Sequence, residues 1–457
     1  MSSPFHSSSF RDPSGFVFRH EGEIYRQVNQ RYKEHFDRLH DSGLYDTLVK
    51  QNLLIPHKDA GLSLARTTEA YKIIKPEQVP FISHPYEWSF SQFQDAALAT
   101  IKIQKAAFEK GMVLKDASAY NIQFHKGRPL LIDTLSLETY REGTPWVAYR
   151  QYCEHFLGPL ALMSYRDVRL SQLLRRHIDG IPVDLASSLL PAKTRLKGGL
   201  MMHLHLHAKS QARHQDNPAA AKSAKVSRAG LQGIIESLEG TTQALALKSN
   251  TGVWADYYAD TNYSETAAAH KTGLVKRYIE KAAPKTVWDL GGNVGRFSRL
   301  AAERGIFTLS LDLDPAAVEL NYLACRKESI QTMLPLVIDL TNPSPDLGWA
   351  HEERASLQSR GPADLLMALA LVHHLAISNN TPLDRIAKYF AALGRQLIIE
   401  FVPKGDSQVE RLLASREDIF DNYTQEGFEK AFGQFFNTLE REAVEDSKRT
   451  LYLLQIR

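Results

Sequence analysis

An acid and three glycines next to one short apolar run are the residues of this chain with the clearest chemical use. Asp289 is the next-to-last residue of the run TVWDL, and the stretch GGNVGRFS follows the run at once with Gly291, Gly292 and Gly295. Glycines at this spacing let the backbone turn tightly and approach a ligand where side chains would collide with it. The carboxylate beside the turn favours a cationic ligand. A phosphate-binding loop would carry a lysine, which this stretch lacks.

Two more acids end the next two apolar runs. Asp312 ends FTLSLD, roughly 20 residues beyond the glycines, where dinucleotide-binding folds keep their ribose-binding acid. Asp339 ends LPLVID, where it could accept a hydrogen bond from an adenine amino group. Each acid alone could simply cap the helix that follows it. Because successive parallel strands end at one crevice, the three acids together predict a nucleoside site.

A pair of histidines follows the fourth apolar run. His373 and His374 stand in VHHLAISNN, which we expect at the mouth of the same crevice. Either could act as a general base on a hydroxyl, since imidazole titrates near neutral pH, although both could equally pack or cap the next helix. Asn379, Asn380 and Glu400 are further candidates for contacts with a second substrate.

Alternating apolar runs and amphipathic stretches must position these residues. Apolar runs cover residues 286–290, 307–312, 334–339, 363–369 and 396–402. Runs of this length separated by helical segments predict a parallel sheet with both faces covered. The final stretch FNTLEREAVEDSKRTLYLLQIR has two extended segments around a polar turn at 446–448, which predicts an antiparallel hairpin at the sheet edge.

The motifs WDLGGNVGRFS, SLDLDPAAVELN, VIDL and MALALVHHLAI, in this order, resemble those of class I methyltransferases. The resemblance covers 254–457 and implies a Rossmann-like, doubly wound, seven-stranded sheet, with S-adenosylmethionine as methyl donor. By this likeness the methionine part lies at the glycine turn, the ribose at the second acid and the adenine at the third. The implied cofactor-binding residues are Asp289, Gly291, Gly292, Asn293, Gly295, Asp312, Leu313, Asp339 and Leu340.

The methyl acceptor is less well specified. Methylation of a base amine usually goes with an Asn-Pro-Pro-aromatic motif after the fourth strand, where this chain has VHHL, and cytosine carbon methylation needs a Pro-Cys pair that neither Cys153 nor Cys325 provides. A small molecule, a carbohydrate or a protein is favoured, and nucleic acid is not required. The layout resembles rhizobial host-specificity nodulation methyltransferases, which implies a carbohydrate or envelope-related acceptor. A regulator that binds the cofactor without catalysis is the alternative.

The N-terminal half holds one segment with chemical potential, GMVLKDASAYNIQFHKGRPLLIDTLSLE. Asp116 and Asn121 have the spacing of the aspartate and asparagine of a kinase catalytic loop, and Asp133 ends the next strand as a metal-binding aspartate would. This resemblance implies a magnesium and ATP site, and a bifunctional protein as an alternative function. A glycine-rich loop is missing upstream, and Lys115 replaces the arginine that precedes the aspartate in kinases.

The other interpretation of this segment is purely structural. A long amphipathic helix over 91–110 would be followed by a β-hairpin that turns at Lys126 and Gly127. Further on, MMHLHLHAK would present His203, His205 and His207 on one face of a half-buried strand. A metal site there lacks a carboxylate or cysteine partner nearby.

Length and composition bound the whole. A chain of 457 residues, 43% of them hydrophobic, needs at least two domains. We expect an N-terminal α+β domain over 1–206, a basic linker over 207–230 and the methyltransferase domain over 231–457. The net charge of +3 and two cysteines suggest neither a nucleic-acid surface nor a disulfide framework. Without a signal peptide or an apolar span, the protein is expected in the cytoplasm, with its oligomeric state open.

Overall fold

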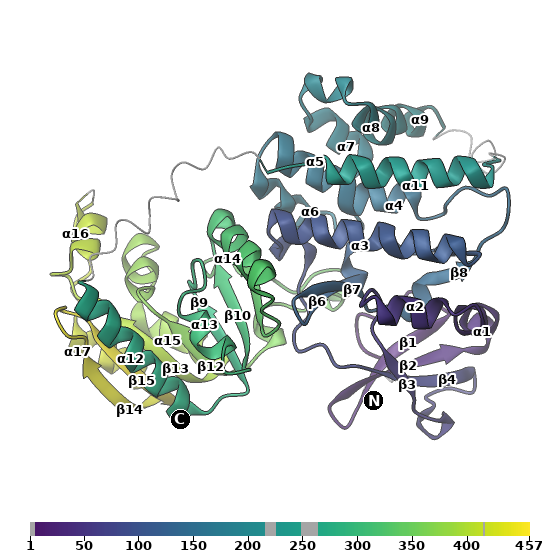
Figure 1. Ribbon diagram of the computed structural model, residues 1–457. Helices are drawn as coiled ribbons and strands as arrows, with labels where there is room; N and C mark the ends of the chain where they lie inside the picture. The colour runs from purple at the N-terminus through teal and green to yellow at the C-terminus, as the bar shows by residue number, and fades with distance from the viewer. Residues whose placement is uncertain (1–4, 215–224, 248–263, 415) are drawn as a thin grey trace. The chain divides into compact units, whose positions relative to one another are not determined.

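The computed structural model describes residues 5–214, 225–247, 264–414 and 416–457, which form two compact units (Figure 1). The first unit comprises residues 1–248 and 348–354, and the second comprises 249–347 and 355–457. The chain therefore leaves the second unit after Leu347, contributes one short segment to the first and returns. From the sequence WADYYADTNYSE, Tyr257, Tyr258 and Tyr263 could form an aromatic lid over a bound cofactor or could pack in the core, and all three lie outside the described residues.

A seven-stranded sheet forms the centre of the second unit, in the order β11-β10-β9-β12-β13-β15-β14. Its strands are β9 (Thr286–Leu290), β10 (Phe307–Asp312), β11 (Met333–Val337), β12 (Ala363–Ala368), β13 (Gly394–Phe401), β14 (Phe436–Ala443) and β15 (Thr450–Ile456). The first five are parallel, and β15 runs antiparallel to both β13 and β14. The predicted Rossmann-like sheet with a reversed final hairpin is confirmed.

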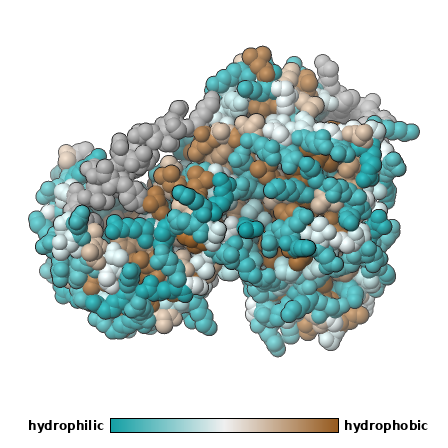
Figure 2. All heavy atoms as spheres, in the orientation of Figure 1, coloured by the Kyte–Doolittle hydropathy of each residue, from teal (hydrophilic) through white to brown (hydrophobic). Residues whose placement is uncertain are grey.

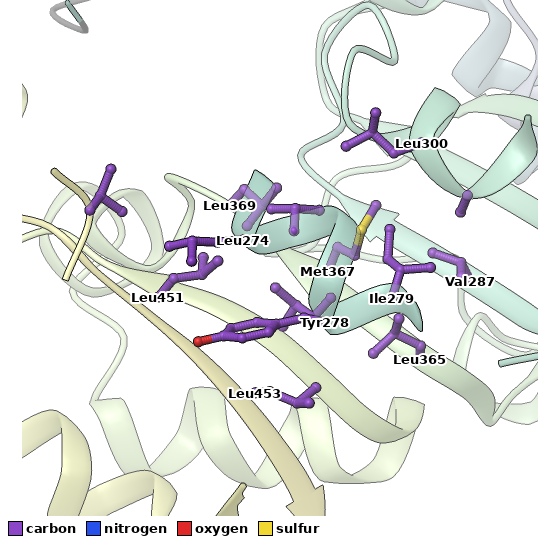
Figure 3. Packing of buried hydrophobic residues seen from close by; sticks show 14 of the residues in the cluster. Leu274, Tyr278, Ile279, Val287, Leu300, Leu365, Met367, Leu369, Leu451 and Leu453 are labelled. Carbon is purple, nitrogen blue, oxygen red and sulfur yellow. The ribbon is translucent and has the colours of Figure 1, made fainter. Parts of the chain in front are cut away.

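Helices cover the sheet on both faces. They are α12 (Glu265–Ala282), α13 (Ser298–Ala302), α14 (Pro315–Glu328), α15 (Leu383–Leu393), α16 (Ser407–Leu413) and α17 (Gln425–Phe432). Tyr278 and Ile279 of α12 pack against Met367 in one buried cluster (Figure 3). Neighbouring strand residues point to opposite faces, and both Leu365 and Leu366 are fully buried. Each such side chain stabilises the fold by about 1.5–3 kcal/mol.

The first unit begins with a four-stranded antiparallel sheet in the order β1-β2-β4-β3. Its elements up to residue 139 are β1 (Gly15–His20), β2 (Glu23–Asn29), α1 (Lys33–Asp41), α2 (Leu44–Lys50), β3 (His57–Asp59), β4 (Ala70–Pro76), α3 (Phe90–Glu109), β5 (Met112–Leu114), β6 (Ile122–His125), β7 (Arg128–Leu131) and β8 (Leu137–Thr139). The predicted long helix is α3, and the predicted hairpin is β6 and β7. Lys126 and Gly127 form its turn, both with positive φ.

Helices complete the first unit, and one expectation fails there. They include α4 (Tyr149–Tyr152), η6 (Cys153–Leu157), α5 (Gly158–Tyr165), α6 (Leu173–Arg176), α7 (Val183–Leu189), η8 (Ala192–Leu196), α8 (Gly198–Leu200), η9 (Met201–Leu206), α9 (His207–His214) and α11 (Arg228–Gln243). The predicted strand of alternating histidine and leucine is instead helical, as η9 and the start of α9. Buried hydroxyl partners explain this: His203 lies 2.9 Å from both Tyr149 Oη and Ser237 Oγ.

The first unit also extends beyond the expected boundary at 207–230. Helix α11 begins at Arg228, within that segment, continues to Gln243 and still belongs to the first unit. Its buried residues Leu231, Ile235 and Leu238 form a stripe at helical spacing, and Glu239 forms a 2.8 Å ion pair with Lys105 of α3. No helix in the described part of the chain is both long and apolar enough to cross a membrane.

Candidate functional site

The bend after β9 is built from residues with left-handed backbone torsions. Gly291, Asn293 and Gly295 have φ values of 76°, 48° and 81°. The N–H of Gly291 donates to the carbonyl of Leu311 in β10, at 2.8 Å. A Cβ atom at Gly295 would lie 2.6 Å from the Asn321 amide, so this position excludes any larger residue. The bend is thus fixed by torsion and by packing.

Asp289 lies beneath this bend. The side chain is buried, and its Oδ2 accepts a 2.6 Å hydrogen bond from the hydroxyl of Ser298. A Cβ atom at Gly292 would come within 2.5 Å of Ser310 Oγ, which itself lies 2.9 Å from Ser298 Oγ. Burial raises the pKa of Asp289 to about 7. Neither serine was singled out from the sequence, where the signal for each was a hydroxyl at a core-facing position.

Asp312, at the end of β10, ties that strand to the bend. Its Oδ2 accepts a 2.7 Å hydrogen bond from the N–H of Asn293, and its Oδ1 accepts one of 2.9 Å from the N–H of Asp314. Burial raises the pKa of Asp312. Each carboxylate oxygen has a further lone pair for a hydroxyl donor. The adjacent Leu313 side chain is 62% exposed, so an apolar surface borders this carboxylate.

The end of β11 lies next to the end of β10. The N–H of Ile338 donates to the carbonyl of Asp312 at 2.8 Å. Asp339 is half-buried, and its Oδ1 accepts from the N–H of Thr341 at 2.8 Å and from the Thr341 hydroxyl at 2.6 Å. Leu340 is half-buried. The three predicted acids therefore come from adjoining strand ends at one edge of the sheet.

The predicted histidines follow β12. Their ring centroids are 4.3 Å apart, and His373 is only 1% exposed whereas His374 is half-buried. Burial, with smaller effects of His374 and Arg449, lowers the pKa of His373 to about 3, and burial lowers the pKa of His374. Both imidazoles are therefore neutral at pH 7. The loop starts beside the bend, since a Cβ atom at Gly291 would lie 3.2 Å from Leu371.

A buried set of charges lies around the end of β13, with side chains from β13, from α12 and from the residue before β15. Glu400 of β13 is fully buried, with Lys271 Nζ 2.7 Å from its Oε2 and Arg449 3.7 Å from its Oε1. Arg449 also pairs with Asp406 at 2.7 Å. The Glu400 carboxylate is enclosed by cations, so a direct contact with a second substrate, as the sequence suggested, does not fit its burial. Neither cation was found from the sequence.

The two asparagines after the histidines are exposed. Asn379 Nδ2 donates to the carbonyl of His374 at 3.0 Å, and Asn380 Oδ1 accepts a 2.9 Å hydrogen bond from Arg416. Both amides thus hold the loop that carries the histidines.

The segment that resembles a kinase loop is folded into a pair of adjoining loops. The N–H of Ile132 donates to the carbonyl of Asn121 at 2.8 Å, and the N–H of Lys115 donates to the carbonyl of Ser136 at 2.8 Å. Asn121 Nδ2 also donates to Ser136 Oγ at 3.2 Å. The structure therefore brings Asn121 and the turn that begins at Asp133 side by side.

Both acids of this segment already have partners. Asp116 Oδ1 accepts a 2.7 Å hydrogen bond from Gln151 Nε2. Asp133 Oδ1 accepts from the N–H of Leu135 at 2.9 Å and lies 2.8 Å from the guanidinium of Arg26. In the described residues no group of three or more His, Cys, Asp or Glu side chains could hold a metal ion. Arg26 is the partner that sequence reasoning missed.

One relative covers almost the whole chain. The sequence is 34% identical over 460 residues to nodulation protein NoeA of Rhizobium meliloti (strain 1021), which covers 98% of this chain and 95% of that protein. The chain belongs to the NoeA family of nodulation proteins. The predicted resemblance to rhizobial nodulation proteins is thereby confirmed. No protein-family model matches the sequence.

Three solved structures each match less than half of this NoeA-family chain. The magnesium protoporphyrin IX methyltransferase ChlM of Synechocystis PCC 6803, with bound SAM, has a TM-score of 0.32 at 16% identity and covers 45% of this chain and 89% of that one. The N-methyltransferase NodS of Bradyrhizobium japonicum WM9 has a TM-score of 0.31 at 11% identity, with 42% and 98% covered. The bifunctional kinase-methyltransferase WbdD has 0.29 at 16% identity, with 42% and 40% covered.

Proposed function

We propose that this NoeA-family protein transfers a methyl group from S-adenosylmethionine to an acceptor molecule. The observation that carries the proposal is the left-handed bend after β9, which the Asp312 carboxylate joins to the end of β10. The glycines leave the backbone of the bend open to a ligand, and the carboxylate lies at the adjoining strand end. Together they suit a ligand that has a cationic part and a ribose. The motif order of class I methyltransferases supports the same donor.

The donor fits the side chains present. Asp312 offers free lone pairs to ribose hydroxyls, and the exposed Leu313 side chain offers an apolar surface beside it. Asp339 and Leu340 would lie at the adenine, and the bend over Asp289 at the methionine part. The sulfonium supplies an activated methyl group with a neutral leaving group, so the protein has chiefly to align the acceptor and remove its proton.

The acceptor class we favour is a carbohydrate or an envelope-related molecule, which kinship with a nodulation protein supports. For a hydroxyl acceptor, His374 is the better general base of the two histidines. It is neutral and half-buried, whereas the pKa of His373, about 3, makes that residue a weak base.

A labelled-methyl assay tests the function. The purified chain is incubated with S-adenosylmethionine labelled in its methyl group and with a cell extract, which is then separated into glycan, small-molecule, protein and RNA fractions. Label in the glycan or small-molecule fraction is the expected result. Donor binding without label in any fraction would favour a regulator that binds the cofactor without catalysis.

Phosphotransfer in the first unit is a second candidate, favoured by one observation, the pairing of the Asn121 loop with residues 132–136. The acids present do not fit a magnesium ion as they stand, because Asp133 is bound to Arg26. The test is magnesium-dependent nucleotide binding that Asp133→Asn removes, since asparagine keeps an Oδ1 acceptor for Leu135 and Arg26 and so preserves the fold. Absence of nucleotide binding in the unaltered chain would dismiss this candidate.

A further inference from the structure

Four large aliphatic side chains of the first unit are exposed on neighbouring elements. Their exposed fractions are 37% for Leu189 at the end of α7, 88% for Leu196 at the end of η8, and 43% and 47% for Met202 and Leu206 in η9. Figure 2 shows hydrophobic side chains at the top of the view, in the region of α7 to α9. Isolated exposed aliphatic residues are ordinary, but a group of them marks a binding surface.

His205 holds these elements together from inside. Its Nδ1 lies 2.8 Å from Ser187 Oγ of α7, and its Nε2 lies 2.9 Å from Thr194 Oγ1 of η8. His205 and Thr194 are buried, so the hydrogen bond between them is shielded from water, while Ser187 is half-buried. The imidazole therefore fixes α7 and η8 against η9, and with them the exposed aliphatic residues. The histidine-rich stretch of the sequence has this structural use.

Basic residues surround the aliphatic ones. Lys193, Arg195 and Lys197 flank Leu196 and are exposed, and Lys209 continues the outward stripe of Met202 and Leu206 on the next turn. The sequence from residue 185 to residue 215 contains no Asp or Glu. We call the exposed aliphatic and basic residues of 189–209 the apolar-basic patch.

We propose that the apolar-basic patch docks on the surface of an anionic lipid bilayer. Aliphatic tips enter the boundary between headgroups and acyl chains, while lysine and arginine side chains remain among anionic headgroups. A nucleic acid fits less well, since the patch offers it no exposed aromatic side chain for stacking and presents aliphatic groups that a phosphate backbone does not cover. The proposal does not depend on methyl transfer.

Vesicle sedimentation with the full chain tests the proposal. Vesicles of phosphatidylglycerol and phosphatidylcholine should retain the protein, vesicles of phosphatidylcholine alone should retain much less, and added salt should release it. Leu196→Glu should weaken the binding by roughly tenfold, because it replaces a membrane-inserted aliphatic group by a like-charged carboxylate. The matched control is Leu62→Glu, at a 56% exposed leucine elsewhere in the same unit, which should bind as the unaltered chain does.

Three outcomes would overturn the proposal. The first is equal retention by the two kinds of vesicle, or by neither. The second is retention that Leu196→Glu leaves unchanged. The third is a change of oligomeric state in Leu196→Glu, measured by analytical ultracentrifugation without any vesicle binding, which would assign the patch to a second copy of the chain.

Discussion

In the second unit, Asp312 is held by backbone N–H groups of Asn293 and Asp314, whereas in the first unit Asp133 is held by the guanidinium of Arg26. Asp312 is the last residue of β10 and Asp133 stands two residues after the end of β7, and each precedes a turn. Among the described residues no cation forms an ion pair with Asp312, so its charge is left for a ligand. The same sequence cue thus yields a binding carboxylate in one unit and an internally neutralised one in the other.

The largest effect is expected on the stability of the first unit, where Arg26 neutralises Asp133. Asp133→Ala should lower the free energy of unfolding of the first unit by about 3–5 kcal/mol, because it leaves the buried Arg26 guanidinium without its partner. Urea denaturation measures this. Asp116→Ala is the matched control, since Asp116 is hydrogen-bonded to an amide, and should cost about 1 kcal/mol. Equal losses in the two variants would remove the contrast between the units.

The next effect concerns turnover in the second unit. His374→Ala should reduce methyl transfer by roughly 100-fold, the usual contribution of a general base, and should leave donor affinity unchanged. His373→Ala should have a much smaller effect, because the pKa of this residue is about 3. Kinetics with the labelled donor measure both. If neither variant slows transfer, the histidines are not bases.

Donor affinity should fall when Asp312, which forms no ion pair among the described residues, is replaced. Asp312→Ala should weaken S-adenosylmethionine binding by about 1–3 kcal/mol, as ribose hydroxyls lose their acceptor. Isothermal titration calorimetry measures the affinity. Asp116→Ala, in the other unit, should bind the donor normally. An unchanged affinity in Asp312→Ala would mean that the ribose lies elsewhere.

The smallest effect is a pH dependence set by Asp289. Its pKa of about 7 predicts that donor affinity rises about tenfold from pH 6 to pH 8, as the carboxylate that attracts the cationic ligand becomes ionised. Asp289→Asn should flatten this slope. The stability of the ligand-free protein should change with pH in the opposite direction to the donor affinity. The folded state keeps a proton that the unfolded state releases above pH 3.8, so the unfolding free energy should fall as pH rises towards 7. If donor affinity still rose with pH in Asp289→Asn, the pH dependence would belong to another group.

The sequence predicted the elements far better than the partners of their side chains. All five apolar runs of the second half became strands, because a buried parallel strand needs only a short continuous run of apolar residues. The alternation of histidine and leucine wrongly predicted a strand, since a period of two indicates a strand only when one face stays polar. Here His203 and His205 are buried with hydroxyl partners, and a helix accommodates them.

The sequence predicted the backbone of the candidate site but not the buried side chains that support it. The glycines in the sequence predicted the left-handed bend, because few other residues adopt such torsions without strain. Ser298 and Ser310 were missed, since a single hydroxyl in an apolar stretch has many ordinary uses. Glu400 was noticed, but its enclosure by Lys271 and Arg449 was not foreseen.

The sequence by itself determined the strands, the bend after β9 and the reversed final hairpin, because each depends on the torsions and the apolar periodicity of neighbouring residues. Tertiary structure alone decided which charges meet. Lys271 and Glu400 are separated by 129 positions, and Arg26 reaches Asp133 across the first unit. Ion pairs of this kind form when packing removes two distant side chains from water together, and no local pattern in the sequence encodes that event.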